Sequence, residues 1–359
     1  MNEQATSAVL TAEGLSELSY ETAESNERAV ALFQRAIGAD EGFSLAYAGL
    51  AKAYVQRTDD LRLGPSWLDR AVKAGTRAVE LDPSLGEAYI ALGRAYRIKG
   101  LLRDELRLWQ RRAELDPSDA VANERLGWVL WFTGRANEGL PWLREAAAMR
   151  PDNPWVYFYL GNANLALGEY SEAERMYGKA LQLRSDHSSA QAGVIWSLLA
   201  AKRDEEARSQ LRRFQMGTFD GDRYPLKLAD IEYFLGEDEK ASLHSREALA
   251  EPEERYWPRG FLASTIYGAL VWSTDRATAE EQLGNSERID LKRLEGGDEG
   301  YLPHVDLAAV QAIRSNAGTA CHSLRTAMAL GWRYPSLAAR DRLFENLRTV
   351  QEFFSLVAT

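Results

Sequence analysis

Residues that could catalyse a reaction are few and scattered in this sequence. The only cysteine, Cys321, precedes His322, and a thiol beside an imidazole could form a nucleophilic dyad. On a helix, however, adjacent residues point about 100° apart, so these two side chains cannot hydrogen bond to each other. We therefore expect Cys321 to fill space in the core and His322 to lie on the surface.

The sequence also lacks the spacing of a metal or nucleotide site. The other histidines, His187, His244 and His304, stand far apart, unlike the clustered ligands of a metal centre. Glycines gather at residues 296–300, but no strand is predicted before them and no Lys-Ser or Lys-Thr follows, as a phosphate-binding loop requires. We interpret 296–300 as a linker, and we predict no enzyme activity, no cofactor and no metal ion.

The composition predicts a folded, acidic protein. Its 359 residues are 45% hydrophobic and 27% charged, and the longest apolar stretch, residues 192–201, is far shorter than the roughly 20 residues that span a bilayer. A net charge of -10 disfavours nucleic acid and anionic lipid surfaces. The start of the chain lacks a signal-peptide pattern, and one cysteine fits a reducing compartment, so we expect a cytoplasmic location.

The elements that must position any binding residues repeat along the chain. Residues 80–84, Glu-Leu-Asp-Pro-Ser, recur at 114–118, and an Arg-Pro-Asp follows at 150–152, so that successive prolines are 34 residues apart. The same interval separates a set of aliphatic residues: Leu92, Leu126, Leu160, Val194 and Leu228. Five copies in register indicate an internal repeat.

Each copy predicts two helices joined by a turn. Apolar residues recur every three or four positions in two runs, and a polar turn such as residues 167–169 separates the runs. Alanines in the second run, such as Ala173 and Ala180, let helices approach closely, and a closing proline such as Pro117 cannot continue a helix. Because one pair cannot bury its apolar face alone, the pairs must stack.

This pattern resembles the tetratricopeptide repeat family, which has the same period. One copy carries the family's residues at Tyr89, Leu92, Gly93, Tyr96, Trp109 and Pro117. Glu105 and Arg112 replace two expected alanines in it, and the closing prolines give way to other residues in later copies. The beginning and the end of the chain resemble bacterial arrays of this family that follow a kinase, a cyclase or a winged-helix DNA-binding domain.

The resemblance implies an all-α fold, a right-handed superhelical solenoid of antiparallel helix pairs. Residues 1–255 are expected to hold about seven pairs, starting near residue 10, with an insertion near residues 58–65. Residues 256–359 are expected to continue the same superhelix less regularly. There we predict a helix over 261–271, a shorter one over 277–283, a last pair from about Leu307, and a capping helix through Phe344 and Leu347.

The resemblance also implies a binding groove, because the first helix of each pair lines a concave inner wall in this family. The inward positions and their neighbours hold mainly aromatic and charged residues: Lys52, Arg94, Arg97, Glu124, Trp128, Trp131, Phe132, Trp155, Phe158, Asn162, Trp196, Asp230, Tyr233 and Phe234. Aromatic residues and arginine are enriched at binding hot spots. We therefore expect a scaffold that binds a protein or peptide segment with apolar anchors and some acidic character.

Other interpretations of the same residues stay open. The aromatics could pack against neighbouring first helices or against a C-terminal segment of the chain, and Arg94 and Arg97 could pair with nearby carboxylates. The chain could serve as a regulatory sensor module of a bacterial kinase, cyclase or transcription regulator, or present a substrate to a glycan or lipid assembly enzyme. It could also form a homo-oligomer through Trp257, Trp272 and Trp332.

Overall fold

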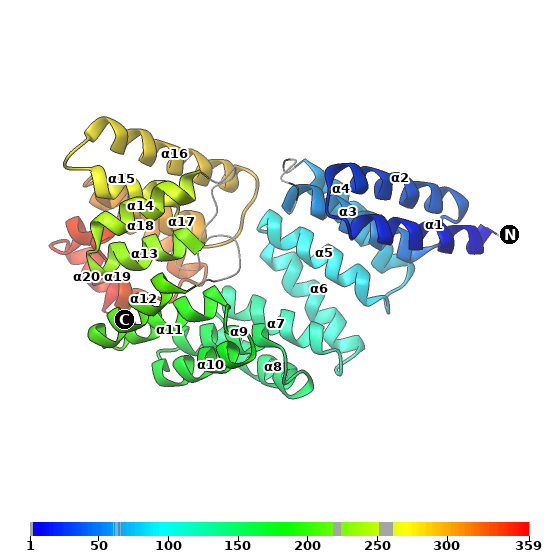
Figure 1. The fold of residues 1–359 in the computed structure, drawn as a ribbon, viewed down its shortest axis with the longest axis horizontal. Helices are drawn as coiled ribbons and strands as arrows, with labels where there is room; N and C mark the ends of the chain where they lie inside the picture. The colour runs from blue at the N-terminus through cyan, green and yellow to red at the C-terminus, as the bar shows by residue number, and fades with distance from the viewer. Residues whose placement is uncertain are drawn as a thin grey trace. The chain divides into compact units, whose positions relative to one another are not determined.

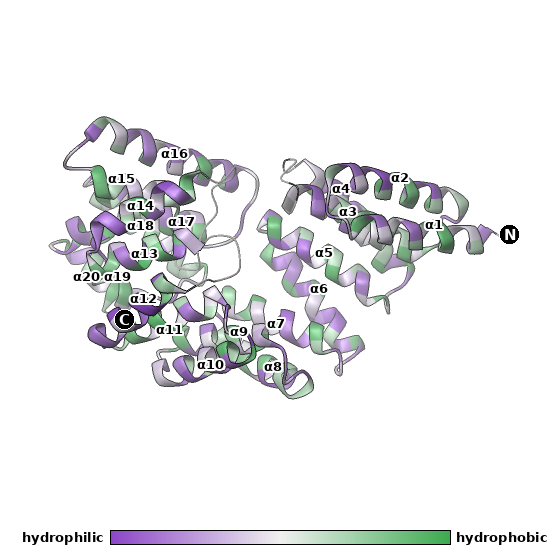
Figure 2. Cartoon of the chain, in the orientation of Figure 1, coloured by the Kyte–Doolittle hydropathy of each residue, from purple (hydrophilic) through white to green (hydrophobic). Residues whose placement is uncertain are grey.

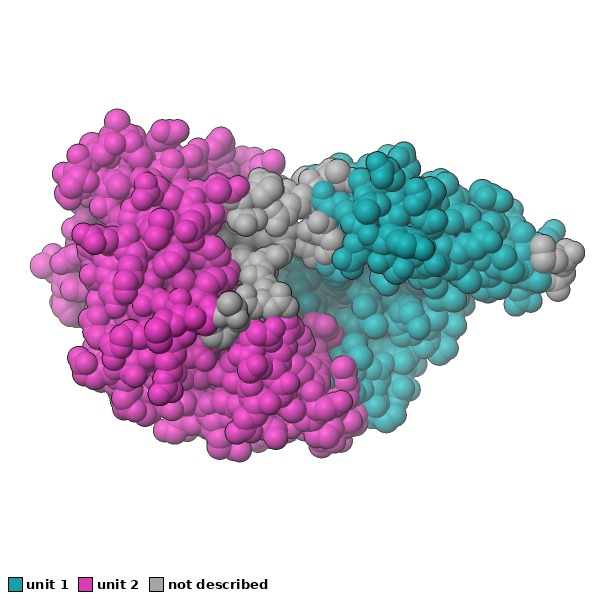
Figure 3. All heavy atoms as spheres, in the orientation of Figure 1, with its two compact units in different colours: residues 1–122 teal, residues 123–359 magenta. Residues whose placement is uncertain are grey.

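All described elements of the chain are helices, which confirms the predicted all-α fold (Figure 1). The computed structural model describes residues 3–59, 61, 64, 66–217, 224–250 and 261–358. The chain divides into two compact units, unit 1 with residues 1–122 and unit 2 with residues 123–359 (Figure 3). In both units, consecutive helices run antiparallel and form a solenoid of pairs.

Unit 1 contains three helix pairs and the first residues of α7. Its helices are α1 (Glu3–Leu18), α2 (Ala23–Ala39), α3 (Ser44–Asp59), α4 (Trp67–Leu81), α5 (Gly86–Lys99) and α6 (Leu102–Leu115). The first pair thus begins at Glu3 rather than near residue 10. Residues 60, 62, 63 and 65 of the insertion predicted near residues 58–65 lie outside the described residues.

Unit 2 contains the later pairs and a C-terminal segment. The regular pairs are α7 (Ala120–Phe132) with α8 (Ala136–Met149), α9 (Pro154–Ala166) with α10 (Tyr170–Leu183), α11 (Ser188–Ala200) with α12 (Asp204–Met216), and α13 (Tyr224–Leu235) with α14 (Asp238–Leu249). They are followed by α15 (Ala263–Val271), α16 (Arg276–Glu295), α17 (Leu302–Ile313), α18 (Ala317–Ala329), α19 (Pro335–Ala338), the 3₁₀ helix η1 (Arg342–Leu347) and α20 (Gln351–Val357).

The backbone itself confirms the predicted 34-residue interval. The turn between the two helices of a pair has one residue in the left-handed region, at Gly100, Gly134, Gly168, Lys202 and Gly236. Glycine adopts this conformation without a steric cost, whereas a side chain at positive φ costs about 1–2 kcal/mol. Lys202, with φ of 60°, therefore stores strain that the other four turns avoid.

Small residues on the first helix of a pair make room for a large side chain on the second. A Cβ atom at Gly93 would lie 2.6 Å from the ring of Trp109, and one at Gly161 would lie 2.5 Å from the ring of Tyr177. Trp109 and Tyr177 are both buried. The Leu-Gly pairs in the sequence thus mark where two helices of a pair touch most closely.

A segment that we name the C-terminal strap, residues 331–342, crosses the turns of the four regular pairs of unit 2 in order. At the first turn, Arg333 lies 3.5 Å from the carbonyl oxygen of Gly134, and Gly331 packs directly on the backbone there. At the second, the hydroxyl of Ser336 lies 3.4 Å from that of Tyr170. Each turn is thus met by a later residue of the strap.

Two arginines anchor the strap at the last two turns. Arg340 donates to both carboxylate oxygens of Asp204, at 2.6 and 2.7 Å, and to the carbonyl of Leu199. Arg342 donates to the carboxylate of Asp238 and, at 2.9 Å, to the carbonyl of Tyr233. Asp204 and Asp238 are each the first residue of the second helix of a pair. The repeat therefore places an equivalent carboxylate opposite each of the two arginines.

Two predictions about the less regular helices were wrong. The helix expected over 277–283 is α16, which runs to Glu295 and is hydrophilic along most of its length (Figure 2). Its buried face continues through Ser286 and Asp290, and Ser286 lies 2.7 Å from the hydroxyl of Thr265, so polar contacts replace the apolar pattern on which the prediction relied. Gly284 faces open space and does not interrupt the helix.

The expected capping helix through Phe344 and Leu347 is instead the short 3₁₀ helix η1. Both side chains are fully buried, and the ring of Phe344 packs between those of Phe261 and Phe353, with centroids 6.1 and 5.9 Å away. An outer cap would present a polar face. This segment therefore fills the core, and α20 follows it as the last helix.

Replacing Lys202 with glycine should stabilise unit 2. Glycine removes the positive-φ cost but adds flexibility to the unfolded chain, so we expect a net gain of about 0.5–1 kcal/mol in the free energy of unfolding, measured by urea denaturation. The matched control is Ala201→Gly, at φ of -77°, which should destabilise. A Lys202→Gly variant no more stable than the natural chain would contradict the strain.

Replacing Arg340 with alanine should loosen the strap. Losing charge-assisted hydrogen bonds should cost about 2 kcal/mol, so that amide hydrogen exchange across residues 331–347 speeds up roughly thirtyfold. The control is Arg175→Ala, which removes an exposed ion pair with Glu172 within α10 and should change exchange little. Unchanged exchange of the strap in Arg340→Ala would show that the arginine does not hold it.

Candidate functional site

The predicted inner-wall residues of unit 2 lie on the first helices α7, α9, α11 and α13. Most of them are less than one-tenth exposed: Glu124, Trp131, Phe158, Asn162, Trp196, Asp230, Tyr233 and Phe234. Trp128 and Phe132 are half-buried. Trp155, with 40% of its surface exposed, is the outlier on this wall.

Later parts of the chain contact several of these aromatics. The ring of Phe132 stacks on Trp128 with centroids 5.1 Å apart and on Tyr301, just before α17, at 4.7 Å. In the strap, the guanidinium of Arg342 lies 4.6 Å from the ring centroid of Tyr233. Arg340 likewise lies 5.6 Å from the ring of Phe234. These intramolecular contacts cover much of the aromatic surface of the predicted wall.

The local sequence Asn-Pro-Trp places Trp155 at the start of α9. The side chain of Asn153 caps the helix by accepting from the amide of Trp155 at 3.0 Å, and Pro154 suits the first helical position. The amide of Asn153 in turn donates to the buried carboxylate of Glu124 at 2.7 Å. Glu124 therefore positions Trp155 through Asn153.

An aromatic cluster surrounds the buried side of Trp155. Its ring lies 4.4 Å from the imidazole of His187, 6.0 Å from Phe158 and 6.3 Å from Tyr159, centroid to centroid. Phe158 also contacts His187, at 5.3 Å. Trp155 thus covers the imidazole and keeps its outer face exposed.

His187, which the sequence did not indicate as a site residue, is a neutral and buried N-cap of α11. Its Nδ1 accepts from the amide of Ala190 at 3.4 Å, so the proton of the neutral ring is on Nε2. Burial, helped by the charges of Arg184 and Lys227, lowers the pKa of His187 to about 4. The imidazole is therefore uncharged near pH 7.

Two buried nitrogen atoms in this region lack a hydrogen-bond partner among the described residues. They are Nε2 of His187 and Nδ2 of Asn162. The other end of the Asn162 amide accepts from the hydroxyl of Tyr177 at 2.6 Å, so its orientation is set. A buried N–H without an acceptor is costly, and both groups would be satisfied by a carbonyl oxygen.

The candidate residues of unit 1 are placed differently. Lys52 is exposed on α3, and Arg94 and Arg97 are half-buried on α5. Arg97 forms an ion pair of 2.6 Å with the fully buried carboxylate of Glu105, which also lies 3.3 Å from the indole nitrogen of Trp109. Glu105, which replaces an expected alanine, is thus held by Arg97.

The tryptophans considered for self-association have separate environments. Trp332 is buried in unit 2, so it does not present a surface. The guanidinium of Arg276 lies 3.2 Å from the ring centroid of the half-buried Trp272. Trp257 lies outside the described residues.

Cys321 and His322 lie where the sequence predicted them. Cys321 is buried, which raises the pKa of its thiol, and His322 is exposed. Among the described residues, His, Cys, Asp and Glu side chains form no group of three that could hold a metal ion. Within those same ranges, every helix is too short or too polar to cross a membrane.

Comparison with known proteins identifies the repeat. The tetratricopeptide repeat family model matches residues 154–187, which are α9, α10 and the residues leading to His187. No match was found among curated proteins.

Solved structures similar to this chain include one with a TM-score above 0.5, which shares its fold. A monomeric IFIT1 mutant with m7Gppp-AAAA is 14% identical, with a TM-score of 0.52, over 90% of this chain and 71% of that one. A tetratricopeptide protein of the thermophile Thermus thermophilus is 22% identical, with a TM-score of 0.42, over 54% of this chain and 99% of that one. PilF of Pseudomonas aeruginosa is 21% identical, with a TM-score of 0.44, over 60% and 94%.

The matched repeat at α9 and α10 recurs at 34-residue spacing in neighbouring helix pairs. The chain therefore contains a tetratricopeptide repeat at residues 154–187, and repeats of this kind generally serve as scaffolds for protein–protein interaction.

Proposed function

We propose that the chain binds an extended peptide or protein segment at the inner wall of α9, with Trp155 as the first contact. The observation that carries this proposal is the 40% exposure of Trp155 on a wall whose other predicted aromatics are buried or half-buried. An exposed indole buries a large apolar area on binding at little cost in side-chain entropy. Of the other predicted groove residues, Phe158 packs against Trp155 with ring centroids 6.0 Å apart, and Glu124 positions it through Asn153.

The two unpartnered donors give the proposed site its polar recognition. A peptide backbone offers carbonyl oxygens, the acceptors that Nε2 of His187 and Nδ2 of Asn162 lack. Because the ring of Trp155 lies 4.4 Å above His187, a partner that displaces this ring gains access to the imidazole. Apolar contact with Trp155 and hydrogen bonding to His187 would then act together.

The partner and setting form part of the same proposal. The net charge of -10 disfavours nucleic acid, so we propose a protein partner and a role without catalysis, in the cytoplasm. We also propose that residues 1–255 and 256–359 belong to one superhelix, although the boundary between 255 and 256 lies outside the described residues. Self-association stays a further expectation, tested by the dependence of molecular size on concentration.

Replacing Trp155 with alanine should weaken peptide binding at this site. We would select peptides from a displayed random library against the intact chain and measure their affinities by fluorescence anisotropy. Loss of a buried indole at a hot spot should weaken binding at least about tenfold. The proposal fails if no selected peptide depends on Trp155.

The chain offers a matched control for that experiment. Trp142, on the second helix α8, is 36% exposed, so Trp142→Ala removes the same side chain at a similar exposure from a different surface. Peptides bound at the proposed site should bind Trp142→Ala as tightly as the natural chain. Equal losses of affinity in both variants would indicate nonspecific binding to exposed indoles rather than a defined site.

Acid should destabilise unit 2 through His187. Its pKa is lower in the folded chain, about 4, than the unfolded value of 6.5, so the unfolded chain takes up the proton first as the pH falls. The contribution of the neutral His187 to the free energy of unfolding is complete above pH 6.5 and is lost as the pH falls toward 4. At pH 5 the loss should be roughly 1–2 kcal/mol.

The variant that tests this is His187→Asn, which keeps an N-cap acceptor and removes the titration. Urea denaturation at pH 7 and pH 5 should show a smaller loss of stability in this variant than in the natural chain. His244, whose hydrogen bond to Glu232 raises its pKa, acts in the opposite direction and is unchanged in both chains. An identical pH dependence of the two chains would show that folding does not lower the pKa of His187.

A further inference from the structure

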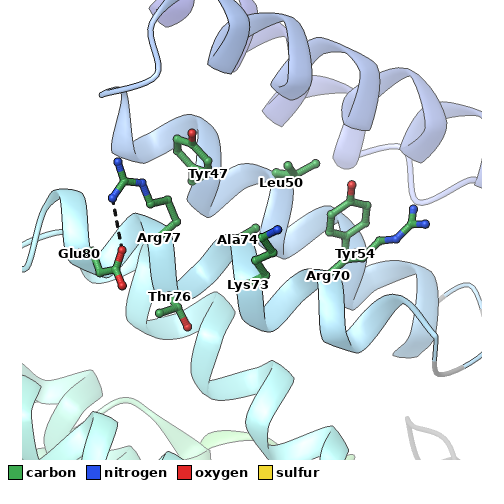
Figure 4. A pocket seen from close by; sticks show the side chains of 9 residues that line it. All are labelled: Tyr47, Leu50, Tyr54, Arg70, Lys73, Ala74, Thr76, Arg77 and Glu80. Carbon is green, nitrogen blue, oxygen red and sulfur yellow. Dashed lines mark hydrogen bonds and ion pairs between the residues drawn. The ribbon is translucent and has the colours of Figure 1, made fainter.

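Unit 1 contains a groove along α3 and α4 that the proposed function does not use (Figure 4). Its volume is about 640 Å³. Its lining combines apolar and basic side chains: Tyr47, Leu50 and Tyr54 of α3, and Arg70, Lys73, Ala74, Thr76, Arg77 and Glu80 of α4. None of them belongs to the inner-wall set predicted from the repeat.

The apolar part of the groove comes from α3. Leu50 and Tyr54 are buried within the unit yet border the groove, and Tyr47 is half-buried beside them. Tyr54 stacks on Trp67 with ring centroids 5.6 Å apart, so aromatic surface continues to the start of α4. A ligand that fits here needs an apolar portion.

The basic part is one face of α4. Arg70, Lys73 and Arg77 recur at three- and four-residue steps and line the same groove, so they lie in a row. Arg77 pairs with Glu80 at 3.3 Å, but both side chains are about half exposed (49% and 58%), so water can replace this pair at little cost. The row therefore remains available to an anionic ligand.

Positive charge is concentrated further at Trp67. The guanidinium groups of Arg57 and Arg70 lie 4.4 and 4.7 Å from the same indole ring. Arg57 donates to the neutral amide of Asn26 at 2.6 Å. Within the described ranges, neither guanidinium contacts a carboxylate, so two like charges share one ring and repel each other.

The spacing of the cations favours a chain-like anion over a compact one. From Arg70 to Arg77 the helix rises about 10 Å, at about 1.5 Å per residue. A single phosphate group is bound where several donors converge on one point, whereas carboxylates distributed along a segment match cations distributed along a helix.

We propose that the groove between α3 and α4 binds an acidic protein segment. An aliphatic or aromatic side chain of the segment contacts Tyr47, Leu50 and Tyr54, and flanking Asp or Glu side chains pair with Arg70 and Lys73. Charge complementarity identifies this partner, because the groove is locally basic on a chain with a net charge of -10. This proposal is independent of the Trp155 site.

The test uses the same displayed library and a different pair of variants of the intact chain. Peptides that bind the Trp155→Ala variant but do not bind the Lys73→Glu variant are assigned to this groove. The two proposed sites are therefore tested separately. We expect such peptides to carry Asp or Glu around one apolar residue. Lys73 is exposed, so reversing its charge should leave the fold intact, which circular dichroism checks.

Affinities of the selected peptides complete the test. Lys73→Glu should weaken binding about tenfold, and raising the salt concentration should weaken binding to the natural chain. Arg111→Glu reverses an exposed cation on α6, outside the groove lining, and should leave binding unchanged. Tyr47→Ala should weaken binding without altering its salt dependence, since it removes only apolar contact.

Three results would overturn the proposal. They are the absence of any peptide that depends on Lys73, an enriched set without acidic residues, and equal affinity for the natural chain and Lys73→Glu. Displacement of a selected peptide by inorganic phosphate, at constant ionic strength, would assign the groove to a small anion and overturn it as well. A double variant, Arg70→Glu with Lys73→Glu, should select basic peptides in place of acidic ones.

Discussion

Close contact between a small residue and a large ring determines how the helices stack. Tyr177 of α10 lies against both α9 and α11, because Cβ atoms at Gly161 and at Gly193 would each stand 2.5 Å from its ring. One buried tyrosine therefore sets the spacing of three helices. Since a helix pair leaves an apolar face uncovered, each pair must stack on a neighbouring one. The position of each inner-wall side chain follows from that stacking.

The C-terminal strap decides which parts of the wall remain accessible. Its arginines reach Asp204 and Asp238, residues that the repeat places at equivalent positions, and in doing so they lie against Phe234 and Tyr233. Aromatic area on this part of the wall thus contributes to folding. Trp155 keeps its outer face exposed, and for this reason the proposed binding site is smaller than the aromatic set in the sequence.

The two proposed sites differ in their electrostatics. Near Trp155, burial keeps His187 neutral, so that site would recognise its partner through apolar contact and uncharged donors. The groove of α3 and α4 carries a row of cations over a tyrosine and leucine floor. Binding at the second site should therefore respond to salt much more strongly than binding at the first. One scaffold could in this way hold two chemically different segments.

Much of the fold could be predicted from the sequence, because the spacing of the repeat is a local property. The recurrence of Leu-Gly, aromatic and proline residues every 34 positions determines helix pairs wherever they occur, and it indicated the turn at Gly168. It failed at α16, where buried Ser286 and Asp290 stand in place of apolar residues. It also failed at η1, where a capping helix was expected. Phe344 and Leu347 are fully buried there and fill the core.

The accessibility of the candidate residues was decided by tertiary structure alone. Periodicity reports which residues share a helix face, but Phe132 is covered by Tyr301, which is distant in the sequence. His187 gained its neutral state from burial beneath Trp155, and Arg97 its partner from the buried Glu105, contacts that the spacing does not encode. The sequence by itself determined the repeat and the residue types on its inner wall. Only long-range packing decided which of them meet solvent, because burial depends on what the rest of the chain places against them.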